Sequence, residues 1–362
     1  MSLAPYLVAW RTTPLHDREV IDALVDPAHA APSAELSAAL HEWPGTYYWS
    51  AEPDGRHLVL TRPTAARTRE SWWIHALLFA ATLFTTTLTG AVIAGALPGD
   101  LSILFHPGAW GRVFFRAWAT GFPFSLPLLA ILLCHELGHY LTARRYQLDV
   151  SPPYFLPGPP APLGIGTFGA FIRLRTILTD RRQLLDVGAA GPIAGFVVAV
   201  VVLWMGLRLS TPDSGYGMTV TIGRELLPLG DSAITLLLRY ATRGGPEPLL
   251  LHPMAFAGWM GMFVTMLNLL PIAQLDGGHI LFSVLPRWHR RVARGFWIFI
   301  MLLGYFSVTW LFWGVIVLLL SRGQLAHPPV LDAYRPLPRS RQWLAWVSVL
   351  LFLLTFAPAP LP

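Results

Sequence analysis

The sequence contains no lysine, a single cysteine and few charged residues of either sign. Charged residues make up 13% of the 362 positions and apolar residues 54%, whereas soluble domains carry roughly 25% charged residues. The one cysteine, Cys134, cannot form an internal disulfide and excludes a metal site built from several cysteines. This composition excludes a disordered chain and an ordinary soluble protein. It predicts a protein with several membrane-spanning segments.

Six stretches are apolar enough to cross about 30 Å of hydrocarbon. They are residues 72–98, 117–134, 187–207, 253–275, 295–320 and 343 to the C-terminus. All 26 basic residues are arginine, and they cluster beside these apolar stretches. Such clustering is typical of cytoplasmic loops of membrane proteins rather than of a nucleic-acid-binding face. We therefore expect a lipid bilayer as the surroundings and no nucleic-acid partner.

The positions of the arginines also predict the orientation of the chain. They precede the first span and lie between spans two and three and between spans four and five, which places these segments in the cytoplasm. The arginines that follow residue 320 would then lie outside. Either residues 295–320 form a bent hairpin that returns to the cytoplasm, or the rule fails there, and the sequence leaves both open.

The first 70 residues are mixed in polarity and are predicted to form a small soluble cytoplasmic region of α+β type. The strand-like segments Tyr47–Ala51 and His57–Thr61 flank Pro53-Asp54-Gly55, which is typical of a hairpin turn. Between His16 and Leu40 we expect helical stretches interrupted by prolines. No residue in this region suggests a chemical role.

A metal-binding pattern ends the second span, where the chain reads Cys134-His135-Glu136-Leu137-Gly138-His139. Positions i and i+4 share one face of a helix, so His135 and His139 can bind one ion at about 2.0–2.1 Å. Glu136 is placed to act as a general base on a water at the metal. The alternative is a pair of interfacial histidines with no metal. Because unpaired ionisable groups are costly at membrane depth, we favour the metal site.

The third ligand is predicted to be Asp276, the first acid after a long uncharged stretch. It lies at the cytoplasmic end of the fourth span, as His135 does in the second, so the two should lie at similar depth. Gly277 and Gly278 are expected to break the helix and allow close approach. Asp276 alone could be a simple helix-end acid. Together with the two histidines it completes three protein ligands and leaves one position open.

These two motifs resemble the signature motifs of the site-2 protease family, zinc metalloproteases that cut peptide bonds within or near the membrane. The resemblance extends from about residue 132 to residue 280. It implies one zinc ion per chain, held by His135, His139 and Asp276, with Glu136 as the catalytic residue. The family's Asn-x-x-Pro element falls on Asn268, which implies contact of that residue with substrate.

Other stretches resemble the branch of this family that includes plastid and bacterial forms. They are Phe155-Leu156-Pro157, Gly166-Thr167-Phe168-Gly169-Ala170 and Gly188-Ala189-Ala190-Gly191-Pro192. Many bacterial members carry a PDZ domain between their core spans. The segment Ser210 to His252 is too short for one, so the resemblance is to a branch without a PDZ domain.

Residues Gly164 to Arg175 are β-prone and glycine-rich and lack a helical pattern. They are predicted to form a re-entrant β-hairpin, whose strand edge would bind an extended substrate through main-chain hydrogen bonds. The resemblance implies a membrane-associated β-loop at the same place. The alternative is an amphipathic loop with its arginines at the lipid head groups. The substrate-binding residues expected here are Gly166, Thr167, Phe168, Gly169 and Ile172.

The expected fold is an all-α polytopic membrane protein of about six transmembrane helices, with the β-hairpin and the α+β N-terminal region added. We expect a soluble region at 1–70, a membrane-embedded metalloprotease domain at 71–320 with its core at 117–285, and a C-terminal loop with the last span at 321–362. Homo-oligomerisation is left open.

The expected function is intramembrane zinc endopeptidase activity on transmembrane substrates, as in regulated intramembrane proteolysis. The expected location is a bacterial plasma membrane, with the active site near the cytoplasmic side. Two alternatives are a non-catalytic metal-binding scaffold and a transporter with a buried His/Asp site. The presence of Glu136 argues against the scaffold, and the lack of an internal repeat argues against the transporter.

Overall fold

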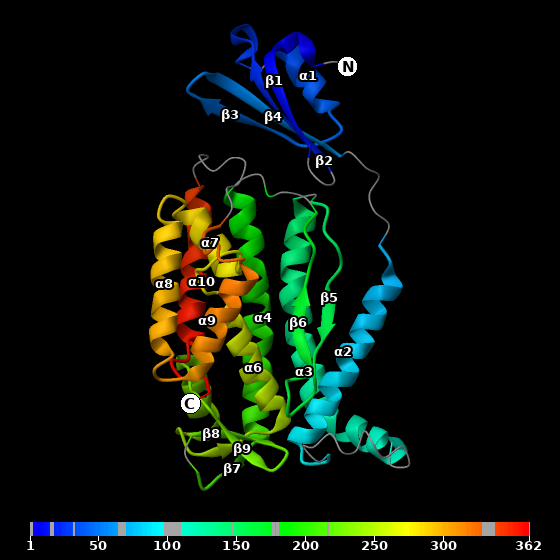
Figure 1. The fold of residues 1–362 in the computed structure, drawn as a ribbon, viewed down its shortest axis with the longest axis vertical. Helices are drawn as coiled ribbons and strands as arrows, with labels where there is room; N and C mark the ends of the chain where they lie inside the picture. The colour runs from blue at the N-terminus through cyan, green and yellow to red at the C-terminus, as the bar shows by residue number, and fades with distance from the viewer. Residues whose placement is uncertain are drawn as a thin grey trace. The chain divides into compact units, whose positions relative to one another are not determined.

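The computed structural model describes residues 3–14, 18–31, 33–63, 70–97, 110–146, 148–175, 178, 181–215, 217–327 and 337–361. The chain divides into two compact units, Met1–Glu70 and Ser71–Pro362 (Figure 1). Each unit has a hydrophobic core of its own.

The first unit is a four-stranded antiparallel sheet packed against one helix. The strand order is β1-β2-β4-β3, with bounds β1 (Leu7–Pro14), β2 (Arg18–Val25), β3 (Tyr47–Glu52) and β4 (Gly55–Pro63). Helix α1 (Ala34–His41) buries Leu36 and Leu40 against Leu58 and Leu60 of the sheet. Short 3-10 turns cover Ala4–Tyr6 and Pro27–His29.

The hairpin predicted around Pro53 and Asp54 is confirmed, because Glu52 pairs with Gly55 across that turn. The helical stretches expected after His16 are wrong for Arg18–Val25, which is strand β2. This strand is paired on both sides, with β1 and with β4. Those two ladders and the burial of Val20 and Val25 outweigh the local helix propensity of the segment.

Three helices of the second unit are long and apolar enough to cross a membrane: α2 (Trp72–Ile93), α3 (Trp110–Arg145) and α4 (Arg181–Leu209). They correspond to the first three predicted spans. Helices α3 and α4 pack against each other and both contact α6 (Pro253–Asn268) (Figure 1). The chain is a multi-pass membrane protein.

The other predicted spans fall on shorter helices, and their crossing of a membrane stays a prediction. Residues 295–320 lie on an antiparallel pair, α8 (His289–Leu303) and α9 (Val308–Leu320). The indole of Trp297 on α8 donates to the Gly314 carbonyl on α9 at 2.9 Å. This segment therefore forms a helical hairpin, and its return to the cytoplasm stays a prediction. Helix α10 (Gln342–Thr355), after a 3-10 turn at Arg339–Arg341, packs against α4 and α6.

The predicted β-hairpin is present as β5 (Tyr154–Pro157) paired antiparallel with β6 (Thr167–Phe171). Strand β5 contacts α2 and strand β6 contacts α3, so the hairpin lies between these helices (Figure 1). Its depth in a membrane stays a prediction.

A second small sheet was not predicted, and the expectation of a membrane unit whose only sheet is the hairpin is wrong for residues 211–250. This sheet has the order β7-β10-β8-β9, with bounds β7 (Thr211–Pro212), β8 (Met218–Ile222), β9 (Glu225–Leu229) and β10 (Leu249–Leu250). Helix α5 (Ala233–Arg243) follows β9. Strands β7 and β10 have only two residues each, which is too short for a periodic pattern. Strands β8 and β9 have five residues each and pair across a two-residue turn that begins with Gly223, a hairpin that the sequence analysis missed.

Candidate metal centre

His135 and His139 lie one turn apart on α3, with Glu136 between them. All three side chains are buried, with 5%, 7% and 7% of the surface of His135, Glu136 and His139 exposed. Helix α3 continues to Arg145, well beyond the motif, so the two imidazoles stay on one face. The local sequence alone produces this half of the site.

Asp276 is brought to the histidines by a break between α6 and α7 (Asp276–Val284). The intervening residues 269–275 include Pro271 and Ala273, whose φ is 51°. Gly277 and Gly278 do not break a helix as expected. They lie in the first turn of α7, where a Cβ on Gly277 would meet the carbonyl oxygen of residue 269 at 2.1 Å. Because these glycines have no side chain, the first turn of α7 can pack directly against the backbone of residues 269–273.

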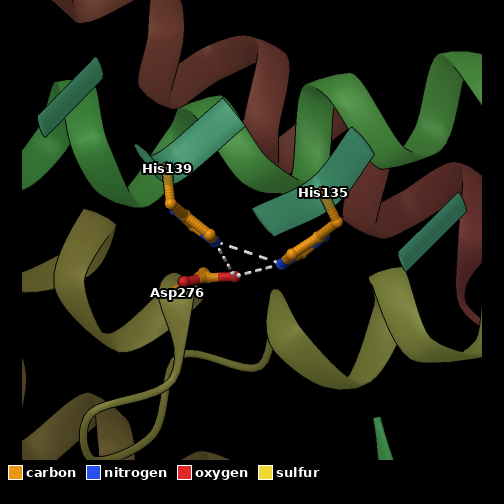
Figure 2. Close-up of side chains that lie close together, drawn as sticks. All are labelled: His135, His139 and Asp276. Carbon is orange, nitrogen blue, oxygen red and sulfur yellow. Dashed lines mark hydrogen bonds and ion pairs between the residues drawn. The ribbon is translucent and has the colours of Figure 1, made fainter. Parts of the chain in front are cut away.

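The three predicted ligands form a small triangle of donor atoms (Figure 2). His135 Nε2 lies 3.1 Å from His139 Nε2, and Asp276 Oδ2 lies 3.3 Å and 3.4 Å from these two nitrogens. Ligands about 2.0–2.1 Å from a tetrahedral zinc ion are about 3.3–3.4 Å apart. The triangle therefore matches one face of a zinc coordination sphere.

The hydrogen bond on the far side of His139 supports a metal at this position. Its Nδ1–H donates to the carbonyl of Val187 on α4 at 2.7 Å, which leaves the Nε2 lone pair facing the triangle. Two imidazole nitrogens and a carboxylate oxygen that lie within 3.4 Å of one another suit a shared cation. Val187 could not be found from the sequence, because every residue carries a backbone carbonyl.

The α4 backbone lies directly against the two imidazoles. A Cβ on Gly191 would lie 2.1 Å from His139 Nε2, and one on Gly195 would lie 3.1 Å from His135 Cβ. A Cβ on Gly138 of α3 would likewise lie only 2.5 Å from the carbonyl oxygen of Ala190. The absence of side chains at these positions gives the rings their room.

Glu136 is the buried acid beside the triangle and is not one of its corners. The backbone N–H of Ile172, directly after β6, faces the Glu136 carboxylate. The amide nitrogen of Asn268, at the end of α6, lies 3.2 Å from His135 Nε2. Asn268 and Ile172 were predicted as substrate-binding residues, and the structure places both next to the metal-binding motif.

The remaining predicted substrate-binding residues lie on or beside β6. Phe168 is 74% exposed, whereas Thr167 is buried and its hydroxyl donates to the Leu156 carbonyl at 2.8 Å. Gly169 follows with a φ of 102°. Gly166 is held within the chain: its N–H donates to the carbonyl of residue 159, and its carbonyl accepts from Thr85 on α2 at 2.6 Å. Gly166 therefore anchors the hairpin to α2, and binding of a substrate along residues 168–172 stays a prediction.

The segment after α9 contacts the loop before Asp276 and helix α7. The carbonyl of Leu325 accepts from Ala273 N–H at 3.0 Å, in the loop that leads to Asp276. His327 Nε2 lies 2.7 Å from His279 Nδ1 on α7, and the His327 ring stacks on Phe282. These contacts tie the start of α7 to the end of α9.

The fold and this site define a membrane protein with a buried metal-binding group between apolar helices. Residues 123–309 match peptidase family M50. The match covers more than half of the sequence, and the chain belongs to this family, the site-2 protease family.

Several of the similar proteins are named as probable zinc metalloproteases. The chain is 35% identical over 212 residues to "Probable zinc metalloprotease EGY2, chloroplastic" of Arabidopsis thaliana, covering 57% of this chain and 36% of that protein. It is 32% identical over 219 residues to "Probable zinc metalloprotease EGY1, chloroplastic" of Oryza sativa subsp. japonica, covering 58% and 37%. For the EGY1 protein of Arabidopsis thaliana the identity is 32% over 244 residues, covering 65% and 42%. The chain thus spans well under half the length of these relatives.

Proposed function

We propose that this chain is an intramembrane zinc metalloendopeptidase that hydrolyses peptide bonds in or near transmembrane segments of membrane proteins. The triangle of His135, His139 and Asp276 carries the proposal, because its edges of 3.1 to 3.4 Å match a zinc site and it is buried beside an apolar helix. The family and the names of the relatives support it.

One zinc ion per chain would be held by these three residues, and it supplies Lewis-acid chemistry that acidifies a water and polarises the scissile carbonyl. Glu136 takes the proton of the attacking water and delivers it to the leaving amine. The Ile172 N–H faces the Glu136 carboxylate, and its proposed role is to orient that carboxylate. Burial of the whole group excludes bulk water from the reacting atoms.

The substrate is proposed to be a transmembrane helix that has unwound locally. An intact helix hides its carbonyls in its own hydrogen bonds, so an extended segment must form before cleavage. The edge at residues 168–172 would bind this segment through its main chain. Asn268, adjacent to the ligand His135, is positioned to donate a hydrogen bond to the bound peptide or to the oxyanion.

The protein is proposed to reside in a bacterial plasma membrane with the metal centre near the cytoplasmic side. The arginine-rich segments between spans support this orientation. The names of the relatives place those proteins in chloroplasts.

The test is cleavage of a single-span substrate by the purified, reconstituted protein. Glu136→Gln is expected to lower the rate about 10²–10⁴-fold, the contribution of a general base, while the zinc content persists. Glu225→Gln, on the exposed strand β9, removes the same charge and is the matched control. Cleavage by Glu136→Gln at the wild-type rate contradicts the proposal.

A further inference from the structure

Four arginines and one tryptophan at the start of α8 line a hollow of about 590 Å³. They are Arg287, Trp288, Arg290, Arg291 and Arg294. All five side chains are exposed, and the guanidinium of Arg291 lies 5.0 Å above the Trp288 ring. Figure 1 shows α8 at one edge of the helical unit, away from the β5–β6 hairpin.

The charge of this hollow is not balanced by an acidic side chain of the described residues. Within the described part of the chain, no ion pair involves any of the four arginines. Four like charges around one hollow repel one another unless an anion lies among them. Guanidinium groups are suited to phosphate, which they bind through two parallel hydrogen bonds.

The face of α8 that carries the arginines continues as an apolar surface. Within α8, Arg290, Arg291 and Arg294 share one helical face, and the next positions on that face are Ile298 and Leu302. Ile298 is 53% exposed and Leu302 is 67% exposed. Along one outward face, a cluster of positive charge therefore leads within two turns to exposed aliphatic side chains.

The opposite face of α8 faces the protein interior. His289, Ala293 and Ile300 are buried there, and the His289 ring packs edge-on against Phe282 of α7 at 5.7 Å. The arginine face is therefore fixed outward, toward the surroundings of a multi-pass membrane protein. Along the chain, this face follows directly after α7, the nine-residue helix whose first residue is Asp276.

We propose that Arg287, Trp288, Arg290, Arg291 and Arg294 bind the phosphate of an anionic membrane lipid, whose acyl chains lie along Ile298 and Leu302. The continuity of charged and apolar surface selects a lipid over free phosphate, because free phosphate needs no apolar face. This site is separate from the metal centre and does not depend on the peptidase proposal.

The test measures binding of phosphatidylglycerol to the full-length protein in nanodiscs of phosphatidylcholine. A basic residue near an anionic lipid contributes roughly fivefold in binding, so Arg291→Gln/Arg294→Gln should weaken binding about 30-fold. Arg144→Gln/Arg145→Gln at the exposed end of α3 removes the same charge and should stay within twofold of wild type. Equal losses in the two double variants overturn the proposal, since they indicate a general charge effect.

A second variant separates lipid from free phosphate. Ile298→Asn leaves the arginines in place and should weaken phosphatidylglycerol binding at least fivefold while leaving the binding of inorganic phosphate unchanged. Inorganic phosphate that displaces the lipid at equal concentration would identify a free-phosphate site and overturn the lipid assignment. Unchanged lipid binding by Ile298→Asn would do the same. Zinc content, measured in every variant, checks that the fold is intact.

Discussion

The closest approach of backbone to ligand in the metal centre makes Gly191→Ala a severe test of the site. The added Cβ would lie 2.1 Å from His139 Nε2 and 2.5 Å from two ring carbons, whereas ordinary contacts begin near 3.4 Å. The ring must therefore retreat by more than 1 Å. Metal–ligand distances tolerate only about 0.2 Å, so a retreat of that size removes His139 from the triangle.

The surroundings offer no easier response. On its other side the His139 ring donates to the Val187 carbonyl at 2.7 Å, and the side chain is buried. Movement of α4 away from α3 would draw Val187 away from the ring and lose that bond instead. Displacing a catalytic group by about 1 Å lowers the rate about 100-fold. Losing the hydrogen-bond partner of a metal ligand, here the Val187 carbonyl bound by His139, lowers metal affinity about 10–100-fold.

The assay is zinc stoichiometry together with the rate of substrate cleavage. Gly191→Ala is expected to lose zinc and at least 100-fold in rate. Gly195→Ala, whose Cβ contact of 3.1 Å requires a shift of only a few tenths of an ångström, should lose much less. Gly295→Ala on α8, with nothing within 4 Å, is the neutral control. Full zinc content and wild-type cleavage by Gly191→Ala would refute the geometry.

Three further perturbations test other parts of the chain. Asp276→Asn is expected to lose zinc, because an amide is a poorer zinc ligand than a carboxylate. Glu136→Gln is expected to keep its zinc. Equal zinc content in the two purified proteins counts against Asp276 as a ligand. Ile172→Pro removes the backbone N–H that faces Glu136 and should lower cleavage at least tenfold with zinc retained. Ile172→Ala keeps this N–H and should keep most of the rate, and equal rates in the pair would exclude this role. Burial disfavours the charged form of His57, but the hydrogen bond and charge of Asp22 outweigh it and raise the pKa of His57 above its ordinary 6.5. This charge stabilises residues 1–70 fully below pH 6.5, and the contribution is lost as the pH rises through the higher pKa of the folded state. The rate of amide hydrogen exchange in β2 and β4 should therefore rise with pH more steeply than the intrinsic exchange rate of an unfolded chain does. A His57→Gln variant that shows the same additional rise would contradict the argument.

The parts of the site that sequence could predict are those governed by local periodicity. His135 and His139 share a face because a helix repeats every 3.6 residues, and no tertiary information is needed. Asp276 followed from its position at the end of an uncharged stretch. The β3–β4 hairpin followed from Pro53 and Asp54, whose turn chemistry is equally local.

The parts that could not be predicted depend on contacts distant in sequence. The Val187 carbonyl and the Ile172 N–H act through the backbone, which no residue type identifies. Strand β2 owes its conformation to two neighbouring strands, and the break before Asp276 is set by residues 269–275 rather than by the following glycines. In each case the partner determines the structure, and the partner is not visible in the local pattern.

The coordination of zinc in the purified wild-type protein tests the central claim most directly. Elemental analysis should show one zinc per chain. X-ray absorption at the zinc edge should show only nitrogen and oxygen ligands at about 2.0–2.1 Å, with the scattering signature of two imidazoles. A sulfur ligand at about 2.3 Å would place Cys134 in the site. That result, or a protein purified without zinc that fails to take it up, would contradict the assignment of His135, His139 and Asp276.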